Sequence, residues 1–369
     1  MIWLLIFIFT FYTILIVSLT TGFSKVKAFR SKSNKEATSF SVVIPFRNEA
    51  KNLPHLLASI SKINYSKELV EFILVDDDSS DNSIAIIDDF LNRGTTIRII
   101  KNIRTSNSPK KDAITTAISI AKNNWIVTTD ADCIVPRNWL SILDRFIQDK
   151  KPKMVVAPVN YKVENNFLEQ FQLLDFMSMQ GTTIGGFGID FPFLCNGANF
   201  TYKKNEFLKL NGFEGNNTIA SGDDIFLFEK FIKADKNRVH YLKSKEAIVT
   251  TFPVKTWSDL INQRTRWAAK TSSFSSIKVK LIGLLVLLTN FLVIYYLFAG
   301  NLEILLIPFL VKMIIDLFLF LPTIRFFEHK SSFYKWYIFA SLLYPFFSLF
   351  VILNSLLFKY NWKGRRFKK

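Results

Sequence analysis

Cysteine and histidine are scarce in this sequence, with two cysteines and three histidines among its 369 residues. The two cysteines, Cys133 and Cys195, cannot build a disulfide framework. Their small number excludes a disulfide-rich secreted domain and favours a reducing compartment for the middle of the chain. The cysteines and histidines also form no cluster with the spacing of metal ligands.

The glycine motifs that commonly hold nucleotide phosphates are missing as well. No G-x-G-x-x-G follows the first predicted strand, and no G-x-x-x-x-G-K-[ST] occurs anywhere in the chain. These absences exclude a dinucleotide-binding fingerprint and a P-loop. If the protein binds nucleotide phosphates, a metal ion held by carboxylates is the expected substitute.

Charge is absent from a long segment near the N-terminus, Ile2 to Ser24, which is long enough to span a bilayer. A cleaved signal peptide is the alternative, but no Lys or Arg precedes the apolar run and no A-x-A follows it. We therefore expect residues 1–24 to be a retained transmembrane anchor. The composition agrees, because 49% hydrophobic residues and 38 Phe are too apolar for an ordinary soluble protein.

Two further uncharged segments, Leu281 to Gly300 and Trp336 to Phe358, are also long enough to cross a membrane. Leu302 to Pro322 is apolar but carries Glu303, Lys312 and Asp316; the last two stand one helical turn apart and can neutralise each other. The region 276–358 is thus predicted to hold two to three spans. Three full crossings would place the basic tail outside, so one segment could instead be re-entrant or interfacial.

Basic residues outnumber acidic ones by 47 to 30, a net charge of +17. Many of them flank the predicted spans, in a linker at 25–39 and a tail at 359–369: Lys25, Lys27, Arg30, Lys32, Lys35, Lys363, Arg365, Arg366, Lys368 and Lys369. This placement follows the positive-inside rule better than it resembles a nucleic-acid groove. We expect an integral protein of the cell (inner) membrane, with its polar domain in the cytoplasm and no nucleic-acid partner.

Between the flanking segments, apolar β-branched runs alternate with helical periodicities. The predicted strands and helices, in order, are Phe40–Pro45, Leu53–Ile60, Phe72–Val75, Ile84–Leu91, Thr96–Ile100, Asp112–Ala121, Trp125–Thr129 and Trp139–Ile147. Such alternation predicts a mostly parallel sheet covered by helices on both faces. Further along, Asn166 to Gly188 predicts an amphipathic helix and a mobile glycine-rich loop, in a core or on the membrane surface.

Acidic residues follow two of these strands, with Asp76 and Asp77 after the second, and Asp130 and Asp132 after the fourth. Ligands of open parallel sheets bind at the carboxyl ends of the strands, so both groups are expected to face one cleft. Residues at i and i+2 of an extended chain share a face, which would let Asp130 and Asp132 converge on one hard cation. Taken alone, the D-x-D pattern is more often a strand-end turn whose acids only cap the next helix.

Two polar motifs follow. Asp223 and Asp224 open an apolar helix, where they can stabilise its N-terminus and still act in catalysis. On a helix, Gln263, Arg266 and Trp267 share a face that suits a sugar or a diphosphate. The alternative pairs Arg266 with a core acid and places Trp267 at the membrane edge.

Together these motifs resemble the membrane-bound family 2 glycosyltransferases, whose GT-A-type catalytic domain is flanked by transmembrane helices. The resemblance covers about Phe40 to Trp267 in motif order. It implies an α/β, GT-A-like fold with a mostly parallel sheet, helices on both faces and flanking transmembrane helices. The glycosyltransferase domain, including acceptor or interfacial helices, is expected at 40–275.

The resemblance also implies roles for the acids. Asp76 and Asp77 match the nucleotide-binding motif, in which Asp77 contacts the base, and Asp78 stands where glycine is common. Asp130 and Asp132 match the D-x-D motif, which implies Mn²⁺ or Mg²⁺ together with the diphosphate and ribose of a nucleotide-sugar.

The remaining motifs are matched residue by residue. Lys111 resembles a basic residue near the donor phosphates, and Asp224 matches the general base. Asp223 replaces the glutamate usual at that position. Gln263, Arg266 and Trp267 match Q-x-x-R-W, found in polysaccharide synthases and ceramide glucosyltransferase-like enzymes, which implies contacts to donor or acceptor.

The function implied is an inverting transfer of sugar from a nucleotide-sugar, with UDP as the expected nucleotide, to a lipid, lipid-linked or glycan acceptor at the cytoplasmic membrane face. A processive polysaccharide synthase is the alternative, disfavoured by the small number of spans available for a channel. A membrane-anchored nucleotide-binding scaffold without turnover is a third possibility, against which Asp130, Asp132 and Asp224 argue.

Overall fold

The computed structural model describes residues 2–30, 36–91, 97–216, 221–270, 274–299, 306–362 and 365–367. Several residues named above lie outside this part of the chain: Lys32, Lys35, Thr96, Gly300, Leu302, Glu303, Lys363, Lys368 and Lys369. The chain forms two compact units. A sheet unit contains Lys27–Lys162 and Cys195–Phe252, and a helical unit contains Met1–Val26, Val163–Leu194 and Pro253–Lys369.

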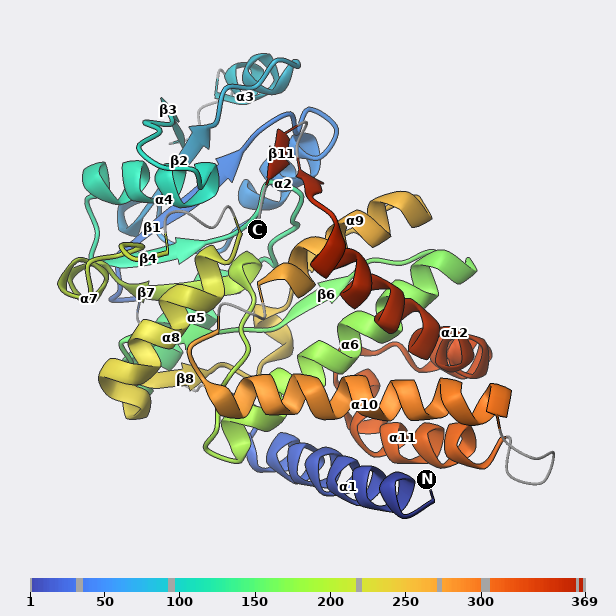
Figure 1. Ribbon diagram of the computed structural model, residues 1–369. Coiled ribbons are helices and arrows are strands. Elements are labelled where there is room, and N and C mark those ends of the chain that lie inside the picture. The colour runs from blue at the N-terminus through green and yellow to red at the C-terminus, as the bar shows by residue number, and fades with distance from the viewer. Residues whose placement is uncertain are drawn as a thin grey trace. The chain divides into compact units, whose positions relative to one another are not determined.

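The sheet unit is built on a seven-stranded sheet of order β3-β2-β1-β4-β7-β5-β8. Its strands are β1 (Phe40–Phe46), β2 (Val70–Asp76), β3 (Ile97–Lys101), β4 (Trp125–Thr128), β5 (Met154–Val156), β7 (Phe200–Lys203) and β8 (Val239–Tyr241). Only β7 runs against its neighbours, pairing antiparallel with β4 and β5. The predicted mostly parallel α/β sheet is therefore confirmed (Figure 1).

Helices flank this sheet. They are α2 (Leu53–Ile60), α3 (Ser83–Leu91), α4 (Pro109–Ile120), α5 (Trp139–Lys150), α7 (Lys204–Lys209) and α8 (Asp223–Asp235). α4 packs against β1 and β2 through side chains that are buried, among them Ala113 and Ala117. The central strands β1, β2 and β4 are almost wholly buried, which is why their sequences are nearly continuous apolar runs.

Strand register sets where the functional loops begin. Phe46 at the end of β1 pairs with Asp76 at the end of β2, and Val43 pairs with Thr128 at the end of β4. The loops that carry the two acidic motifs therefore leave from the same edge of the sheet. A second, two-stranded sheet joins β6 (Val159–Tyr161) and β9 (Val249–Thr251).

The helical unit contains α1 (Ile2–Lys25), α6 (Phe167–Gly188), α9 (Trp257–Ala269), α10 (Ile277–Ala299), α11 (Ile307–Phe327) and α12 (Lys330–Leu357), then a hairpin of β10 (Tyr360–Trp362) and β11 (Arg365–Phe367). Among the residues that the structure describes, four helices have the length and apolar composition of membrane spans: α1, α10, α11 and the part Phe333–Leu357 of α12. α1, α10 and α11 pack side by side (Figure 1).

The prediction of a glycine-rich loop before Gly188 is wrong, because α6 is one helix that runs through all four glycines. Two of them, Gly185 and Gly188, serve close packing against α1 instead. A Cβ at Gly185 would lie 2.4 Å from the carbonyl oxygen of Leu19, and one at Gly188 would lie 1.8 Å from that of Gly22. No side chain fits there, so the backbones of the two helices meet directly.

The charged pair in α11 is formed as predicted. Lys312 Nζ lies 2.6 Å from Asp316 Oδ2, and both side chains are mostly buried. Tyr12 on α1 donates a hydrogen bond to Asp316 Oδ1. Charges inside an apolar bundle require such partners, and this pair also ties α1 to α11.

Candidate active site

The acidic loop after β2 is held in a tight turn. Asp76 Oδ1 accepts a hydrogen bond from the backbone N–H of Ser79 at 3.0 Å. Asp78 adopts a left-handed conformation with φ +65°. This explains how aspartate can stand where glycine is common, since Asp is among the few side chains that tolerate this region of backbone space.

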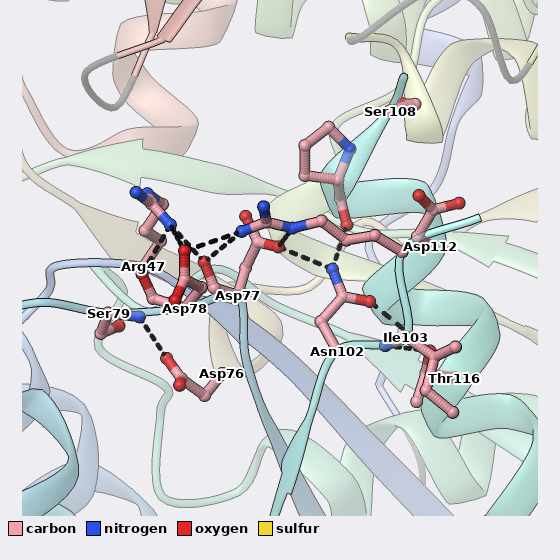
Figure 2. Close-up of polar contacts among 12 residues, drawn as sticks. Arg47, Asp76, Asp77, Asp78, Ser79, Asn102, Ile103, Ser108, Asp112 and Thr116 are labelled. Atoms are coloured by element: carbon pink, nitrogen blue, oxygen red, sulfur yellow. Dashed lines mark hydrogen bonds and ion pairs between the residues drawn. The ribbon is translucent and has the colours of Figure 1, made fainter. Parts of the chain in front are cut away.

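Two arginines hold Asp77 and Asp78 (Figure 2). Arg47 Nη1 donates to the carbonyl oxygens of both residues at 2.6 Å and lies 3.3 Å from Asp78 Oδ2. Arg104 donates from Nε to Asp77 Oδ1 at 2.7 Å and from Nη2 to the Asp77 carbonyl at 2.9 Å. Asn102 Nδ2 also donates to Asp77 Oδ1, at 2.7 Å. Asp77, the predicted base-contacting acid, is thus buried, and its carboxylate accepts hydrogen bonds from Arg104 and Asn102.

The loop that carries Arg104 is itself anchored by Asp112 in the first turn of α4. Asp112 accepts backbone hydrogen bonds from Thr105 and Ser106, at 3.1 and 2.9 Å, and hydroxyl hydrogen bonds from the same two residues. Asn102 reaches the same helix by donating to the carbonyl of Pro109 at 3.0 Å. The start of α4 therefore links Asp77 to the residues described next.

The D-x-D residues lie in a turn beyond the strand. β4 ends at Thr128, and Cys133 N–H donates to the carbonyl of Asp130 at 3.2 Å. The expectation of an extended chain at Asp130 and Asp132 is therefore wrong, although both carboxylates lie at the same edge of the sheet. The turn is fixed by paired backbone hydrogen bonds between Ile134 and Thr250 at 2.7 and 2.9 Å. Burial, with Asp132 and Asp130 nearby, raises the pKa of Cys133, so its thiol stays protonated.

Lys110 connects the D-x-D turn with the start of α8. Its Nζ lies 2.6 Å from Asp130 Oδ1 and 3.1 Å from Asp223 Oδ2. Burial alone would lower the pKa of Lys110, but the carboxylates of Asp130 and Asp223 raise it above the usual lysine value, and the ammonium stays charged. Two motifs separated by some ninety positions are thereby joined through one cation.

Asp224 stands in the first turn of α8, beside Gly197. Its Oδ2 accepts a hydrogen bond from the Gly197 N–H at 3.0 Å, and its Oδ1 accepts one from Ile225 N–H at 2.8 Å. Gly222 supports the helix start with φ +85°, a conformation that glycine adopts freely. A Cβ on Gly197 would lie 3.2 Å from Asp224 Cβ, so the absence of a side chain there lets the carboxylate approach the backbone. Thr128 at the end of β4 donates to the Gly197 carbonyl at 3.2 Å.

The two adjacent lysines of α4 point to different partners. Lys111 is 2% exposed; its Nζ donates to the carbonyl of Asn216 at 2.6 Å and lies 5.0 Å from the ring centre of Phe226. Lys110, which the sequence analysis did not single out, is the lysine that meets the acidic motifs. Arg104, Asn102 and Gly197 were also missed, because none belongs to a motif with a charge or spacing signal.

The Q-x-x-R-W residues lie on α9 in the helical unit. There Arg264 is buried, forms an ion pair with Asp175 of α6 and lies 4.1 Å from the ring centre of Trp267. Gln263 Oε1 accepts a hydrogen bond from Arg264 Nη1. Arg264, two positions before Arg266, thus forms an ion pair with a core acid of the kind that the sequence suggested for Arg266.

The D-x-D turn offers part of the ligand set that a divalent cation would need. Asp130 and Asp132 would supply carboxylate oxygens, the donors that Mg²⁺ and Mn²⁺ prefer. In the described part of the chain, no group of three or more His, Cys, Asp or Glu side chains is arranged to hold a metal. The chemistry of the donor set thus fits a metal that takes its remaining ligands from a phosphate-bearing substrate and water.

A mostly parallel sheet with acidic motifs at its carboxyl edge is typical of GT-A-like folds. Residues 41–219 match the family model for glycosyl transferase family 2. This segment, just under half of the chain, is therefore similar to family 2 glycosyltransferases.

Two known proteins that are similar to parts of the chain are also named as transferases. The glycosyltransferase GlyG of Streptococcus pneumoniae serotype 4 is 34% identical over 117 residues, 32% of this chain and 38% of GlyG. The undecaprenyl-phosphate 4-deoxy-4-formamido-L-arabinose transferase of Proteus mirabilis is 37% identical over 93 residues, 25% of this chain and 28% of that protein. The chain thus spans well under half the length of both relatives.

A solved structure shows the same fold. The mannosyltransferase PcManGT from Pyrobaculum calidifontis, in complex with GDP-Man and Mn²⁺, has a TM-score of 0.51 and 14% sequence identity, and the match covers 94% of this chain and 99% of that chain. At this identity, the likeness concerns the fold alone.

Proposed function

We propose that the protein is an inverting glycosyltransferase that transfers a sugar from a nucleotide-sugar, with UDP as the expected nucleotide, to a lipid or lipid-linked acceptor at the cytoplasmic face of a membrane. The observation that carries the proposal is the contact of Lys110 with both Asp130 and Asp223. It supports a single donor site at the sheet edge that draws on the acidic motifs.

The chain's own residues would divide the work of donor binding. Asp77, held by Arg104 and Asn102, offers a fixed carboxylate to the nucleotide base. Asp130 and Asp132 would hold a divalent cation, which on binding offsets negative charge on the leaving diphosphate. A rigid acid matters because a preorganised group loses little freedom when the nucleotide binds.

Asp224 would act as general base. Its carboxylate removes the proton from the acceptor hydroxyl while that oxygen attacks the anomeric carbon and the bond to the nucleoside diphosphate breaks. The new bond forms on the face opposite to the leaving group, so the configuration inverts. The hydrogen bonds from Gly197 and Ile225 fix the carboxylate in one orientation.

The proposed lipid acceptor and the proposed membrane location are supported by other observations than the donor site. Within the described residues, four helices are long and apolar enough to span a membrane, and one relative is named an undecaprenyl-phosphate 4-deoxy-4-formamido-L-arabinose transferase. Lys25, Lys27 and Arg30 follow the first of these helices, which favours a cytoplasmic placement of the sheet unit. Gln263, Arg266 and Trp267 would orient donor and acceptor from α9.

The experiment that tests this function measures nucleoside diphosphate released from UDP- and GDP-sugars by the full chain with Mn²⁺ and an extract of membrane lipids. We expect release that depends on the lipid and a product enlarged by one sugar. A ladder of longer products would contradict single addition. No release with any common nucleotide-sugar would contradict the proposed function.

A further inference from the structure

The ammonium of Lys110 lies where a cation bound to the acids would lie. It sits 2.6 Å from Asp130 Oδ1 and 3.1 Å from Asp223 Oδ2, and its side chain is 19% exposed. The three groups come from three elements: the start of α4, the turn after β4 and the start of α8. The contact is therefore a property of the folded site and not of neighbours in the sequence.

The charges explain why a cation is needed there. Two carboxylates from different elements, brought to one point, repel each other unless a positive charge lies between them. Lysine suits this role, because its ammonium is a compact charge on a flexible stem and can exchange partners without moving the backbone. Lys111 cannot substitute, since its Nζ is engaged with the carbonyl of Asn216.

A divalent cation that takes an oxygen of Asp130 competes with this ammonium. Two positive centres within contact distance repel strongly in a partly buried site. The incoming metal must therefore displace Lys110 from Asp130 or bind weakly. A nucleoside diphosphate removes the conflict, because its phosphate oxygens provide a new partner for the released ammonium as well as ligands for the metal.

We propose that Lys110 is an internal counter-ion that makes metal and nucleotide bind as a pair: it occupies Asp130 and Asp223 while the site holds neither, and moves to the diphosphate when both bind. This inference rests on the proposed function, because it takes a nucleoside diphosphate as ligand. It predicts that each ligand strengthens binding of the other, by a factor of about 5 to 150, the usual range of such coupling.

We expect the substitution of Lys110 by Met to change the affinities for Mn²⁺ and for UDP in opposite directions. In Lys110→Met, Mn²⁺ alone binds more tightly than in the unchanged protein, because its competitor is gone. UDP with chelator binds more weakly, because the ammonium partner of the phosphates is gone. The factor by which Mn²⁺ and UDP strengthen each other's binding therefore falls toward one. A residue with only a structural role would weaken both.

The test is calorimetric titration of the full chain in detergent with Mn²⁺ alone, with UDP plus chelator, and with Mn²⁺ in saturating UDP. Lys122→Met is the matched control, since Lys122 is exposed just beyond the end of α4, and it is expected to change none of the three affinities. Lys110→Arg retains the charge and adds a bidentate grip on carboxylates, so Mn²⁺ alone is expected to bind no more tightly than in the unchanged protein.

The outcomes are distinct. Equal or weaker Mn²⁺ binding by folded Lys110→Met, or tighter Mn²⁺ binding by Lys110→Arg, overturns the inference and leaves the proposed function standing, because neither titration requires sugar transfer. If Lys110→Met does not fold, the arginine variant decides alone. Failure of the unchanged protein to bind UDP with Mn²⁺ would contradict the donor specificity of the proposed function instead.

Discussion

Arg104 holds Asp77 at two points, with its Nε 2.7 Å from Asp77 Oδ1 and its Nη2 2.9 Å from the Asp77 carbonyl. One guanidinium thus fixes both the side chain and the backbone of the residue proposed to meet the nucleotide base. Arg104, which lies outside the acidic motif, therefore helps to set the orientation of Asp77.

Removal of this guanidinium should weaken nucleotide binding. In Arg104→Met, we expect the dissociation constant of UDP with Mn²⁺ to rise about tenfold, since hydrogen bonds to charged groups contribute roughly 1.5–3 kcal/mol and Arg104 is partly exposed. Calorimetry measures this change. Arg98→Met, an exposed arginine on β3, is the control and should bind as the unchanged protein does; equal affinities of the two variants would speak against the role of Arg104.

The general base can be separated from donor binding. Asp224→Asn keeps an oxygen that can accept from Gly197 N–H but loses basicity. We expect transfer to fall by about 10²–10⁴-fold while the affinity for UDP with Mn²⁺ changes little. Initial rates of nucleoside diphosphate release give the first quantity and calorimetry the second. Asp149→Asn, at an exposed position of α5, is the control; near-normal turnover of Asp224→Asn would exclude it as base.

Asp132→Ala tests the metal site. The loss of one carboxylate should remove the part of UDP affinity that depends on Mn²⁺, so titrations with and without chelator become equal. Asp88→Ala, exposed on α3, should retain the difference. A variant at Asp132 that still gains affinity from Mn²⁺ would place the metal elsewhere.

Gly197 provides a test of the position of Asp224. The Cβ of Gly197→Ala would lie 3.2 Å from Asp224 Cβ and 3.3 Å from Asp223 Oδ2, tight contacts that push the acids away. We expect a lower kcat with a smaller change in KM for the donor, and a melting temperature within a few degrees of normal. Gly283→Ala, where the added Cβ meets nothing within 4 Å, should be silent. A variant with unchanged kcat would mean that this contact does not position the base.

The two arginines of α9 should differ in what they affect. Arg264 is buried against Asp175, so Arg264→Met leaves a buried carboxylate without its partner and should lower the melting temperature clearly. Arg266 is half-buried and is proposed to meet substrate, so Arg266→Met should lower turnover at near-normal stability. Thermal unfolding and initial rates on the same preparations separate the two effects, and the reverse pattern would exchange their roles.

Much of the fold could be predicted because each acidic motif directly follows a strand sequence along the chain. The runs ending at Asp76 and at Thr128 are buried strands of a parallel sheet, and parallel strands carry such continuous apolar sequences. The apolar helices were also predictable, since composition and length suffice to identify candidate spans. These features depend on local pattern alone.

The features that the sequence did not indicate depend on how a helix is rotated on the sheet and on how closely two helices approach each other. Lys110 and Lys111 are chemically identical, and only the packing of α4 on the sheet decides which one faces the acids, because adjacent helical residues point about 100° apart. Glycines of α6 such as Gly185 look like a loop in sequence, yet they serve a contact with α1 that lies far away in the chain. Asp78 likewise adopts a left-handed backbone conformation, which an aspartate in the sequence does not indicate.

The most direct test of the account is the rate of nucleoside diphosphate release by the full chain and by Asp224→Asn, measured side by side with a nucleotide-sugar, Mn²⁺ and membrane lipid. We expect lipid-dependent release that falls by at least about a hundredfold in the variant, with UDP affinity retained. Equal rates for the two proteins, or no release by either, would contradict it.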